Sequence, residues 1–131
     1  MIFPHGAQKL LGWFGGYGFA GTMQFFTGTM HIPYVIGVLV IAVEFFGGLA
    51  LILGIATRIA AFLVGAELVV AMCLVHIHNG FFMNWNGNQK GEGIEFFVLV
   101  AGIVLSLMIL GGGALSLWPC CRRNSEPPTA P

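Results

Sequence analysis

Three long apolar runs dominate the pattern of polar and apolar positions along this chain of 131 residues. Residues 32–57 contain a single charged side chain, Glu44, and residues 59–89 contain only Glu67. Residues 96–121 contain no charged side chain. Because about 20 apolar residues of helix cross a bilayer core about 30 Å thick, we predict three membrane-spanning helices, at about 34–55, 58–78 and 94–115.

The composition also indicates a membrane protein. Charged residues make up 8% of the chain and hydrophobic residues 57%, with a net charge of zero, whereas a soluble domain carries about 25% charged residues. A soluble core cannot hide so much apolar surface, so the lipid bilayer is the expected partner. Nucleic acid is not, because no lysine or arginine cluster is present. The predicted fold class is all-α, a polytopic membrane helix bundle.

The first 31 residues do not form a further clear span. Residues 10–28 are rich in glycine and in aromatic residues such as Trp13 and Tyr17, which favour the headgroup level. We interpret residues 1–31 as an interfacial or partly re-entrant segment with short helical pieces. Together with the spans it makes one membrane domain, residues 1–118, followed by a tail at 119–131 that is predicted to be disordered and cytoplasmic.

The basic residues predict how the chain is oriented. Arg58 is expected on the same side as Arg122 and Arg123, with Lys9 and Lys90 on the other side. Because cytoplasmic loops carry an excess of basic residues, this distribution places the Arg58 loop and the carboxy terminus in the cytoplasm.

The two glutamates within the spans are the first candidates for function, because carboxylates at membrane depth face protein or water. At 100° per residue, small and polar residues share one face of each predicted span. These faces are Gly37, Glu44 and Gly48; Ala60, Glu67, Ala71 and His78; and Glu95, Gly102, Ser106 and Gly113. We expect them to line the bundle interior, where Glu44 and Glu67 are either a proton or cation relay or neutral structural groups hydrogen-bonded to a neighbouring helix.

The four histidines are expected at one membrane edge: His5, His31, His76 and His78. The pair His76 and His78 can bind a metal only if that segment is extended, because the two side chains lie about 200° apart on a helix. Polar residues that cap a span are the more ordinary interpretation, and no metal site is predicted.

No complete catalytic set is present, since the sequence lacks a nucleotide-binding loop and the GxSxG, HExxH and CxxCH motifs. Catalytic residues therefore stay unassigned. Lys9 is expected to be solvated, or to pair with Glu92 or Glu95.

Several ordered motifs resemble the DoxX family of integral membrane proteins. They are HGAQKLLGWFGG at residues 5–16, Gly21-Thr22, EFFGGLALILG at residues 44–54, Thr57-Arg58, Val75-His76, NGFF at residues 79–82, the glycines at 111–113, and Ser116-Leu117. The resemblance covers residues 4–118. It highlights six positions without giving them proven roles: His5, Lys9, Glu44, Arg58, His76 and Asn79.

This resemblance implies a four-helix protein of the bacterial inner membrane, in a family whose members include subunits of quinone-linked oxidoreductases. The family's first helix precedes the His-Gly motif, where this sequence has four residues. A different start, a fragment and a three-span protein are the alternatives.

Three functions agree with these features. The first is a small subunit of, or partner to, a quinone-linked membrane oxidoreductase in thiol redox or thiosulfate metabolism, with quinone as a possible cofactor. The second is a non-catalytic scaffold, and the third is a small-solute or proton carrier that uses both glutamates. Other oxidoreductase subunits or a second copy of this chain are the candidate protein partners.

Overall fold

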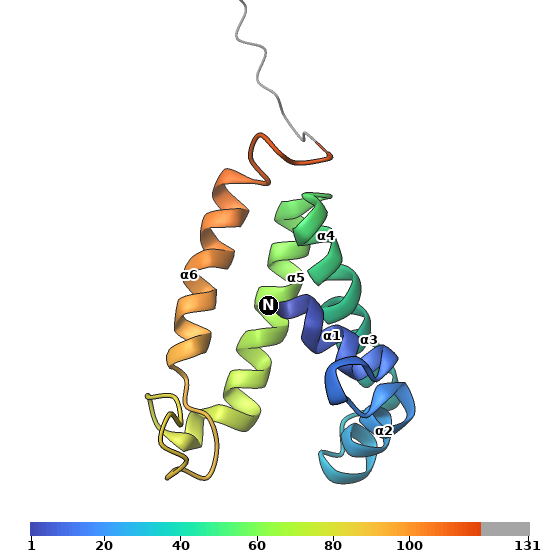
Figure 1. Ribbon diagram of the computed structural model, residues 1–131, viewed down its shortest axis with the longest axis vertical. Helices are drawn as coiled ribbons and strands as arrows, with labels where there is room; N and C mark the ends of the chain where they lie inside the picture. The colour runs from blue at the N-terminus through green and yellow to red at the C-terminus, as the bar shows by residue number, and fades with distance from the viewer. Residues whose placement is uncertain (119–131) are drawn as a thin grey trace, which may run out of the picture.

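A computed structural model describes residues 1–118, in which the regular structure is entirely helical (Figure 1). The residues predicted as a disordered cytoplasmic tail, including Arg122 and Arg123, lie outside the described part. The amino-terminal elements are α1 (Ile2–Leu11), the 3₁₀ turn η1 (Trp13–Gly15), α2 (Gly18–Gln24) and the π-helical turn η2 (Phe25–Thr29). This confirms the short helical pieces predicted for the first 31 residues.

Two helices are long and apolar enough to cross a bilayer. Tyr34–Leu53 has 20 residues and consists of α3 (Tyr34–Ala42), the π-helical turn η3 (Val43–Gly47) and α4 (Gly48–Leu53). Thr57–Asn79 has 23 residues and consists of α5 (Thr57–Ala71), η4 (Met72–His76) and η5 (Ile77–Asn79). Their bounds agree with the first two predicted spans.

The third apolar helix, α6 (Glu95–Leu110), is shorter than predicted, with 16 residues. It ends because Gly111 adopts φ 80° and ψ −164°, a conformation that glycine accommodates and other residues avoid. At 1.5 Å per residue its length is about 24 Å. The last residues of the predicted span, up to 115, therefore follow the helix as a turn-rich segment.

Helix α1 lies beside the middle of Tyr34–Leu53 (Figure 1). This position differs from the interfacial alternative predicted for residues 1–31, but not from the partly re-entrant one. Glycines allow the close approach. A Cβ atom on Gly6 would lie 2.5 Å from the backbone of Phe45, and one on Gly48 would lie 2.8 Å from the backbone of Phe3. Small residues at helix crossings are the usual means of tight packing between membrane helices.

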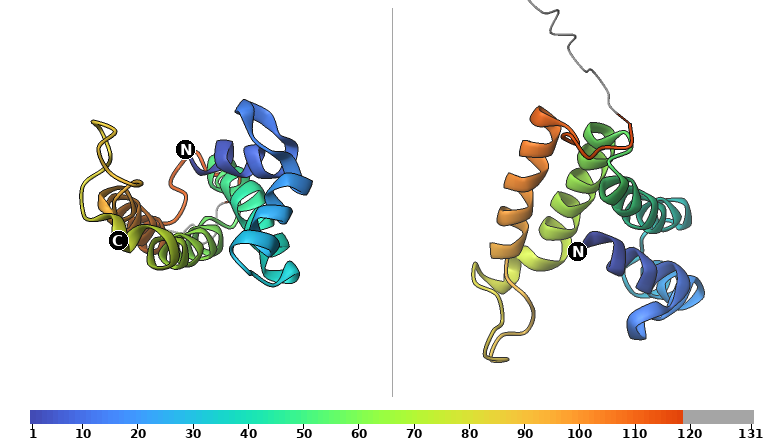
Figure 2. Two further views of the ribbon diagram at one scale, coloured as in Figure 1. Left: turned by 90° about the horizontal axis from the view of Figure 1, so that it is seen from below. Right: turned by 45° about the horizontal axis from the view of Figure 1, so that its top comes forward.

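Helix α6 packs on α5, away from α2, as the two views of Figure 2 show. The predicted interior face of α6 is wrong: Gly102 and Ser106 are exposed, whereas Val100 and Val104 are buried against Ala61. Ser106 needs no partner helix because its hydroxyl donates to the carbonyl of Gly102, one turn earlier, at 2.9 Å.

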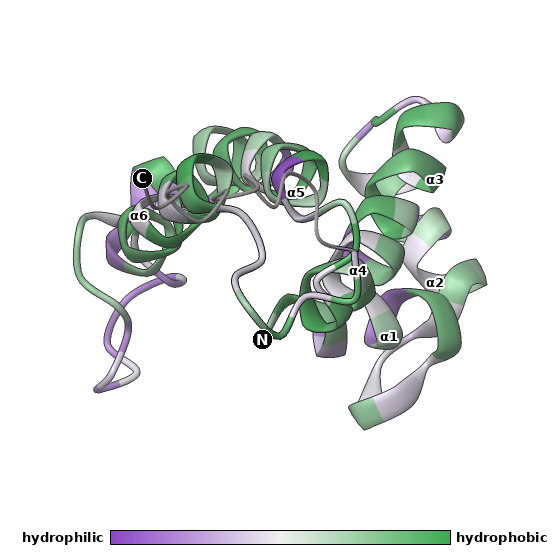
Figure 3. Cartoon of the chain, turned by 90° about the horizontal axis from the view of Figure 1, so that it is seen from above, coloured by the Kyte–Doolittle hydropathy of each residue, from purple (hydrophilic) through white to green (hydrophobic). Residues whose placement is uncertain are grey.

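The other predicted faces agree better with the structure. On the first long helix, Gly37, Glu44 and Gly48 are all buried, as predicted. On α5, Ala60 is buried and Glu67 is half-buried. Colouring by hydropathy shows mostly apolar helices, with hydrophilic residues gathered in the loop between α5 and α6 and in short stretches of α1 and α5 (Figure 3).

We expect Gly6→Ala to lower the free energy of unfolding by about 1–3 kcal/mol, because the added methyl group overpacks the contact with Phe45. Thermal unfolding in mild detergent measures the change. Gly102→Ala is the matched control, because a Cβ atom there meets nothing within 4 Å. It should leave stability unchanged or raise it by up to about 1 kcal/mol. Equal unfolding temperatures for the two variants would contradict the close crossing.

Candidate functional site

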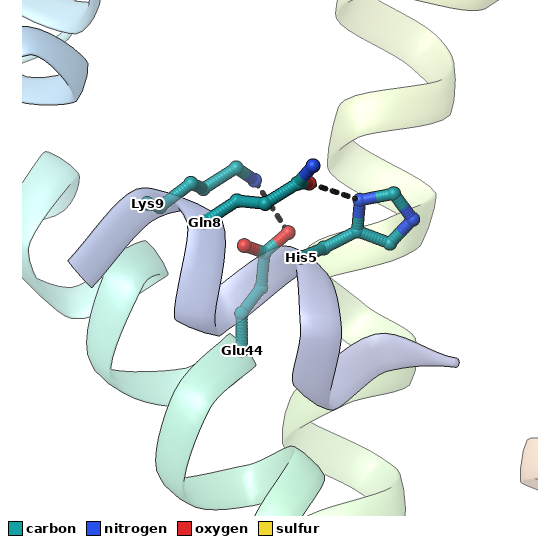
Figure 4. Close-up of polar contacts among 4 residues, drawn as sticks. All are labelled: His5, Gln8, Lys9 and Glu44. Atoms are coloured by element: carbon teal, nitrogen blue, oxygen red, sulfur yellow. Dashed lines mark hydrogen bonds and ion pairs between the residues drawn. The ribbon is translucent and has the colours of Figure 1, made fainter. Parts of the chain in front are cut away.

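An ion pair joins α1 to the middle of the first long helix. Lys9 Nζ donates to Glu44 Oε1 at 2.5 Å, and Glu44 is only 7% exposed (Figure 4). Lys9 is therefore neither solvated nor paired with Glu92 or Glu95, contrary to the prediction. The reason is the position of α1, which places Lys9 at mid-span beside a buried carboxylate that requires a partner.

The backbone around Glu44 is a single π-helical turn, η3, within an otherwise α-helical span. Such turns are frequent at functional sites, because the widened backbone redirects the side chains that it carries. The turn begins one residue before Glu44 and includes Phe45, whose backbone contacts Gly6. Local helix geometry and the crossing with α1 therefore position the carboxylate together.

Glu67 brings a second carboxyl group to the ion pair from α5. It is half-buried, and α5 packs against η3, the turn that carries Glu44. Glu44 Oε2 and Glu67 Oε2 are buried and accept no hydrogen bond from any described residue. Both glutamates thus point into the bundle, and two carboxyl groups share the neighbourhood of one ammonium group.

Lys9 also lines an open pocket of about 610 Å³. This volume lies within the range of small-molecule sites, about 300–1,000 Å³. Besides glycines, its wall contains polar and aromatic residues between positions 8 and 29: Gln8, Tyr17, Thr22, Gln24, Phe25, Phe26 and Thr29. The pocket was not predicted from the sequence, although the mixture of glycine with aromatic and amide residues at 8–29 was the available signal.

His5 belongs to the same region rather than to the membrane edge. Its Nδ1 lies 3.2 Å from Gln8 Oε1, one helical turn away (Figure 4). Gln8 Nε2 donates to the carbonyl of Phe14 at 3.3 Å. Gln8 also lines the pocket beside Lys9. The prediction of an outer-edge position is wrong for His5, because the whole of α1 packs beside the middle of the long helix.

Arg58 lies outside this central site, at the start of α5. Its Nη2 donates to the carbonyl of Ile109 at 3.0 Å, one of the last carbonyls of α6, which have no partner within the helix. A cation at a helix carboxy terminus also interacts favourably with the helix dipole. Arg58 therefore ties the ends of α5 and α6 together.

At the other end of the α5 span, His76 and Asn79 make a second set of contacts that connects neighbouring elements. His76 Nδ1 lies 2.9 Å from the backbone oxygen of Glu92, and Asn79 Nδ2 donates to that same oxygen at 3.2 Å. The His76 ring also packs on Phe97, with centroids 4.6 Å apart. These contacts fix the base of the loop at residues 80–93 against α5 and α6.

The two histidines at this end do not converge. His78 is exposed, while one nitrogen of His76 is engaged with the backbone of Glu92. Within residues 1–118, no group of three or more histidine, cysteine, aspartate or glutamate side chains is placed to hold a metal ion.

The central site lies within the part of the chain that matches a known protein family. The family model DoxX matches residues 1–77, which include Lys9, Glu44 and Glu67. A protein of Bacillus subtilis (strain 168), named "Putative oxidoreductase CatD", is 30% identical over 107 residues. The aligned region covers 82% of this chain and 69% of that protein. No solved structure matches the chain.

We expect Lys9→Met to lower the free energy of unfolding by about 1–3 kcal/mol, because buried Glu44 loses its hydrogen-bond donor. Glu44→Gln should cost less, since Lys9 still has Glu67 within electrostatic reach. Unfolding in mild detergent measures both. Lys90→Met is the control, because Lys90 is exposed in the loop. If Lys9→Met were no less stable than Lys90→Met, the ion pair would not contribute to the stability of the fold.

The loop at residues 80–93 should open more often when the hydrogen bond from Asn79 to the carbonyl of Glu92 is removed. Asn79→Ala leaves the carbonyl of Glu92 with fewer donors, so we expect limited proteolysis within the loop to become several-fold faster, about the effect of losing 1 kcal/mol. The control is His78→Ala, which changes an exposed neighbour. Equal cleavage rates in the two variants would mean that Asn79 does not hold the loop.

Proposed function

The chain belongs to the DoxX family of membrane proteins, and from this premise we propose that it is a small subunit of, or partner to, a quinone-linked membrane oxidoreductase. The name of the Bacillus subtilis relative supports an oxidoreductase role. The proposed setting is thiol redox or thiosulfate metabolism, in which a partner subunit delivers the electrons and this chain supplies the quinone site.

The observation that carries the proposal is that Lys9 both lines the pocket and pairs with Glu44. Lys9 lines the pocket, and its ammonium group is paired with buried Glu44 and lies 5.9 Å from the centroid of the Phe26 ring, which also lines the pocket. A quinone head group is a flat ring with two carbonyl oxygens, so it can pack against Phe25 and Phe26 and accept a hydrogen bond from Lys9. A preorganised cation at this place stabilises the negative charge that develops on the carbonyl oxygen during reduction.

Protons complete the reaction. Reduction of a quinone to a quinol consumes two electrons, which come from the partner subunit, and two protons. Lys9 and the carboxyl groups of Glu44 and Glu67 can hold and pass protons at the pocket wall, since a positioned acid contributes about 10²–10⁴-fold to such transfers. His5 and Gln8 extend this polar route along α1.

We further propose a multi-pass arrangement in the bacterial inner membrane, with the Arg58 end and the carboxy terminus in the cytoplasm. Support comes from the ends of the helices. Arg58 lies at one end, whereas the loop at the other end combines Lys90 with Glu92 and Glu95. Because Lys9 is paired at mid-span, it no longer counts toward either side. The sequence then has Arg58, Arg122 and Arg123 against Lys90, and this excess of basic residues favours a cytoplasmic Arg58 end.

A scaffold role is the alternative, and the loop at residues 80–93 favours it. Phe81, Phe82 and Trp85 are 51%, 65% and 81% exposed on a loop whose base is fixed by His76 and Asn79. Such a surface can bind a partner protein, or a second copy of this chain, without any chemistry at Lys9.

Glu44→Gln tests the choice between these functions. In membranes supplied with a reduced thiol or with thiosulfate, we expect quinone reduction to fall about 100-fold, because the variant removes the acid partner of Lys9. Glu95→Gln is the matched control, since Glu95 accepts a hydrogen bond from the backbone of Met83 away from the pocket. An unchanged rate, with the variant present at normal levels, would contradict the quinone role and favour the scaffold.

A further inference from the structure

The charges at the centre of the bundle do not balance when Lys9, Glu44 and Glu67 are all ionised. Lys9 contributes one positive charge, and Glu44 and Glu67 together contribute two negative charges when both are ionised. Glu44 is 7% exposed and Glu67 is half-buried. An uncompensated charge at such a place carries a large desolvation cost, so a neutral set of groups is strongly favoured.

The hydrogen bonds show the same imbalance. The Glu44 and Glu67 carboxyl groups are carried by η3 and α5, which pack against each other, yet two ionised carboxylates are both acceptors and cannot bond to each other. Glu44 Oε2 and Glu67 Oε2 are buried without a partner among the described residues. One proton on either carboxyl group turns it into a donor to the other, and the unpaired charge disappears in the same step.

We propose that Lys9, Glu44 and Glu67 form a proton-binding site that holds one proton between the two carboxyl groups, while Lys9 remains an ammonium ion. Like-charged carboxyl groups that share a site behave in this way, because both cannot be ionised at close range. This inference goes beyond the quinone role and does not depend on it, since the proton site exists whether or not a quinone binds in the pocket.

The neighbouring elements supply few other titratable groups. On α1, His5 is engaged with Gln8, and Lys9 faces Glu44. On η3 the titratable group is Glu44. Helix α5 carries Glu67 and, at its start, Arg58, whose guanidinium group is bonded to the carbonyl of Ile109. Helix α6, which packs on the other side of α5, begins at Glu95, whose Oε2 is bonded to the backbone of Met83. The proton count of the site is therefore set by Lys9, Glu44 and Glu67.

Infrared spectroscopy of the purified protein in mild detergent measures this count. The C=O stretching band of a protonated carboxylic acid is distinct from carboxylate bands and shifts on exchange into heavy water. At neutral pH we expect one buried carboxylic acid per chain. Glu67→Gln should abolish the band, because Lys9 and Glu44 then neutralise each other. Lys9→Met should double it, because both carboxyl groups then take up a proton.

Glu44→Gln is the decisive variant. A shared proton predicts loss of the band, because the remaining Glu67 then ionises against Lys9. A carboxyl group that is neutral merely because it is buried would keep the band in this variant, and that result would overturn the proposal. So would the absence of the band in the unsubstituted protein. Glu95→Gln, the control outside the site, should leave the band unchanged. These readouts contain no quinone, so they are independent of the quinone-reduction assay.

Labelling with dicyclohexylcarbodiimide gives a second test that needs no variant. The acid proton moves to a carbodiimide nitrogen as the carboxyl oxygen bonds to the central carbon, and rearrangement then gives a stable N-acylurea. Peptide mass spectrometry should find the adduct on half-buried Glu67. Labelling should persist at low pH and fall about tenfold per pH unit once the shared proton is released. Equal labelling of Glu67 across that range would count against a releasable proton.

Discussion

The contact between Gly6 and the backbone of Phe45 determines how the centre of this protein is built. A glycine at this crossing lets α1 approach the π-helical turn so closely that no side chain could be accommodated. Lys9 lies one helical turn further along α1, and its ammonium group bonds to Glu44, the residue before Phe45. The ion pair, and with it the position of Lys9 at the pocket, depends on that single close approach.

The polar residues at the ends of the helices and the carboxyl groups at the centre differ in what they bond. Arg58, His76 and Asn79 satisfy backbone carbonyl groups near the ends of helices or at the base of the loop, and Ser116 does the same for Gly54. In lipid, backbone groups without a partner are costly, so these contacts have a clear structural purpose. The central carboxyl groups differ, because each retains a buried oxygen without a donor.

Sequence patterns predicted the long helices and the buried face of Gly37, Glu44 and Gly48, because length, hydropathy and helical periodicity are local properties. Local patterns could not identify the partner of Lys9, because Glu44 lies 35 residues away in the sequence and the contact depends on how α1 crosses the long helix. The predicted interior face of α6 was also wrong. Periodicity treated Ser106 as a residue in need of a partner helix, whereas its own helix supplies the acceptor.

Stability alone is a poor explanation for the central site. Replacing a buried ion pair by well-packed apolar residues is often neutral or stabilising, and a third ionisable group adds a further desolvation cost. In a chain with only 8% charged residues, packing could be achieved at Lys9, Glu44 and Glu67 with leucine or alanine. A cost of this kind, placed beside a pocket of ligand size, is typical of functional sites, where local rules of stability give way to chemistry. The structure thus favours a protein whose interior handles charge over one that only packs.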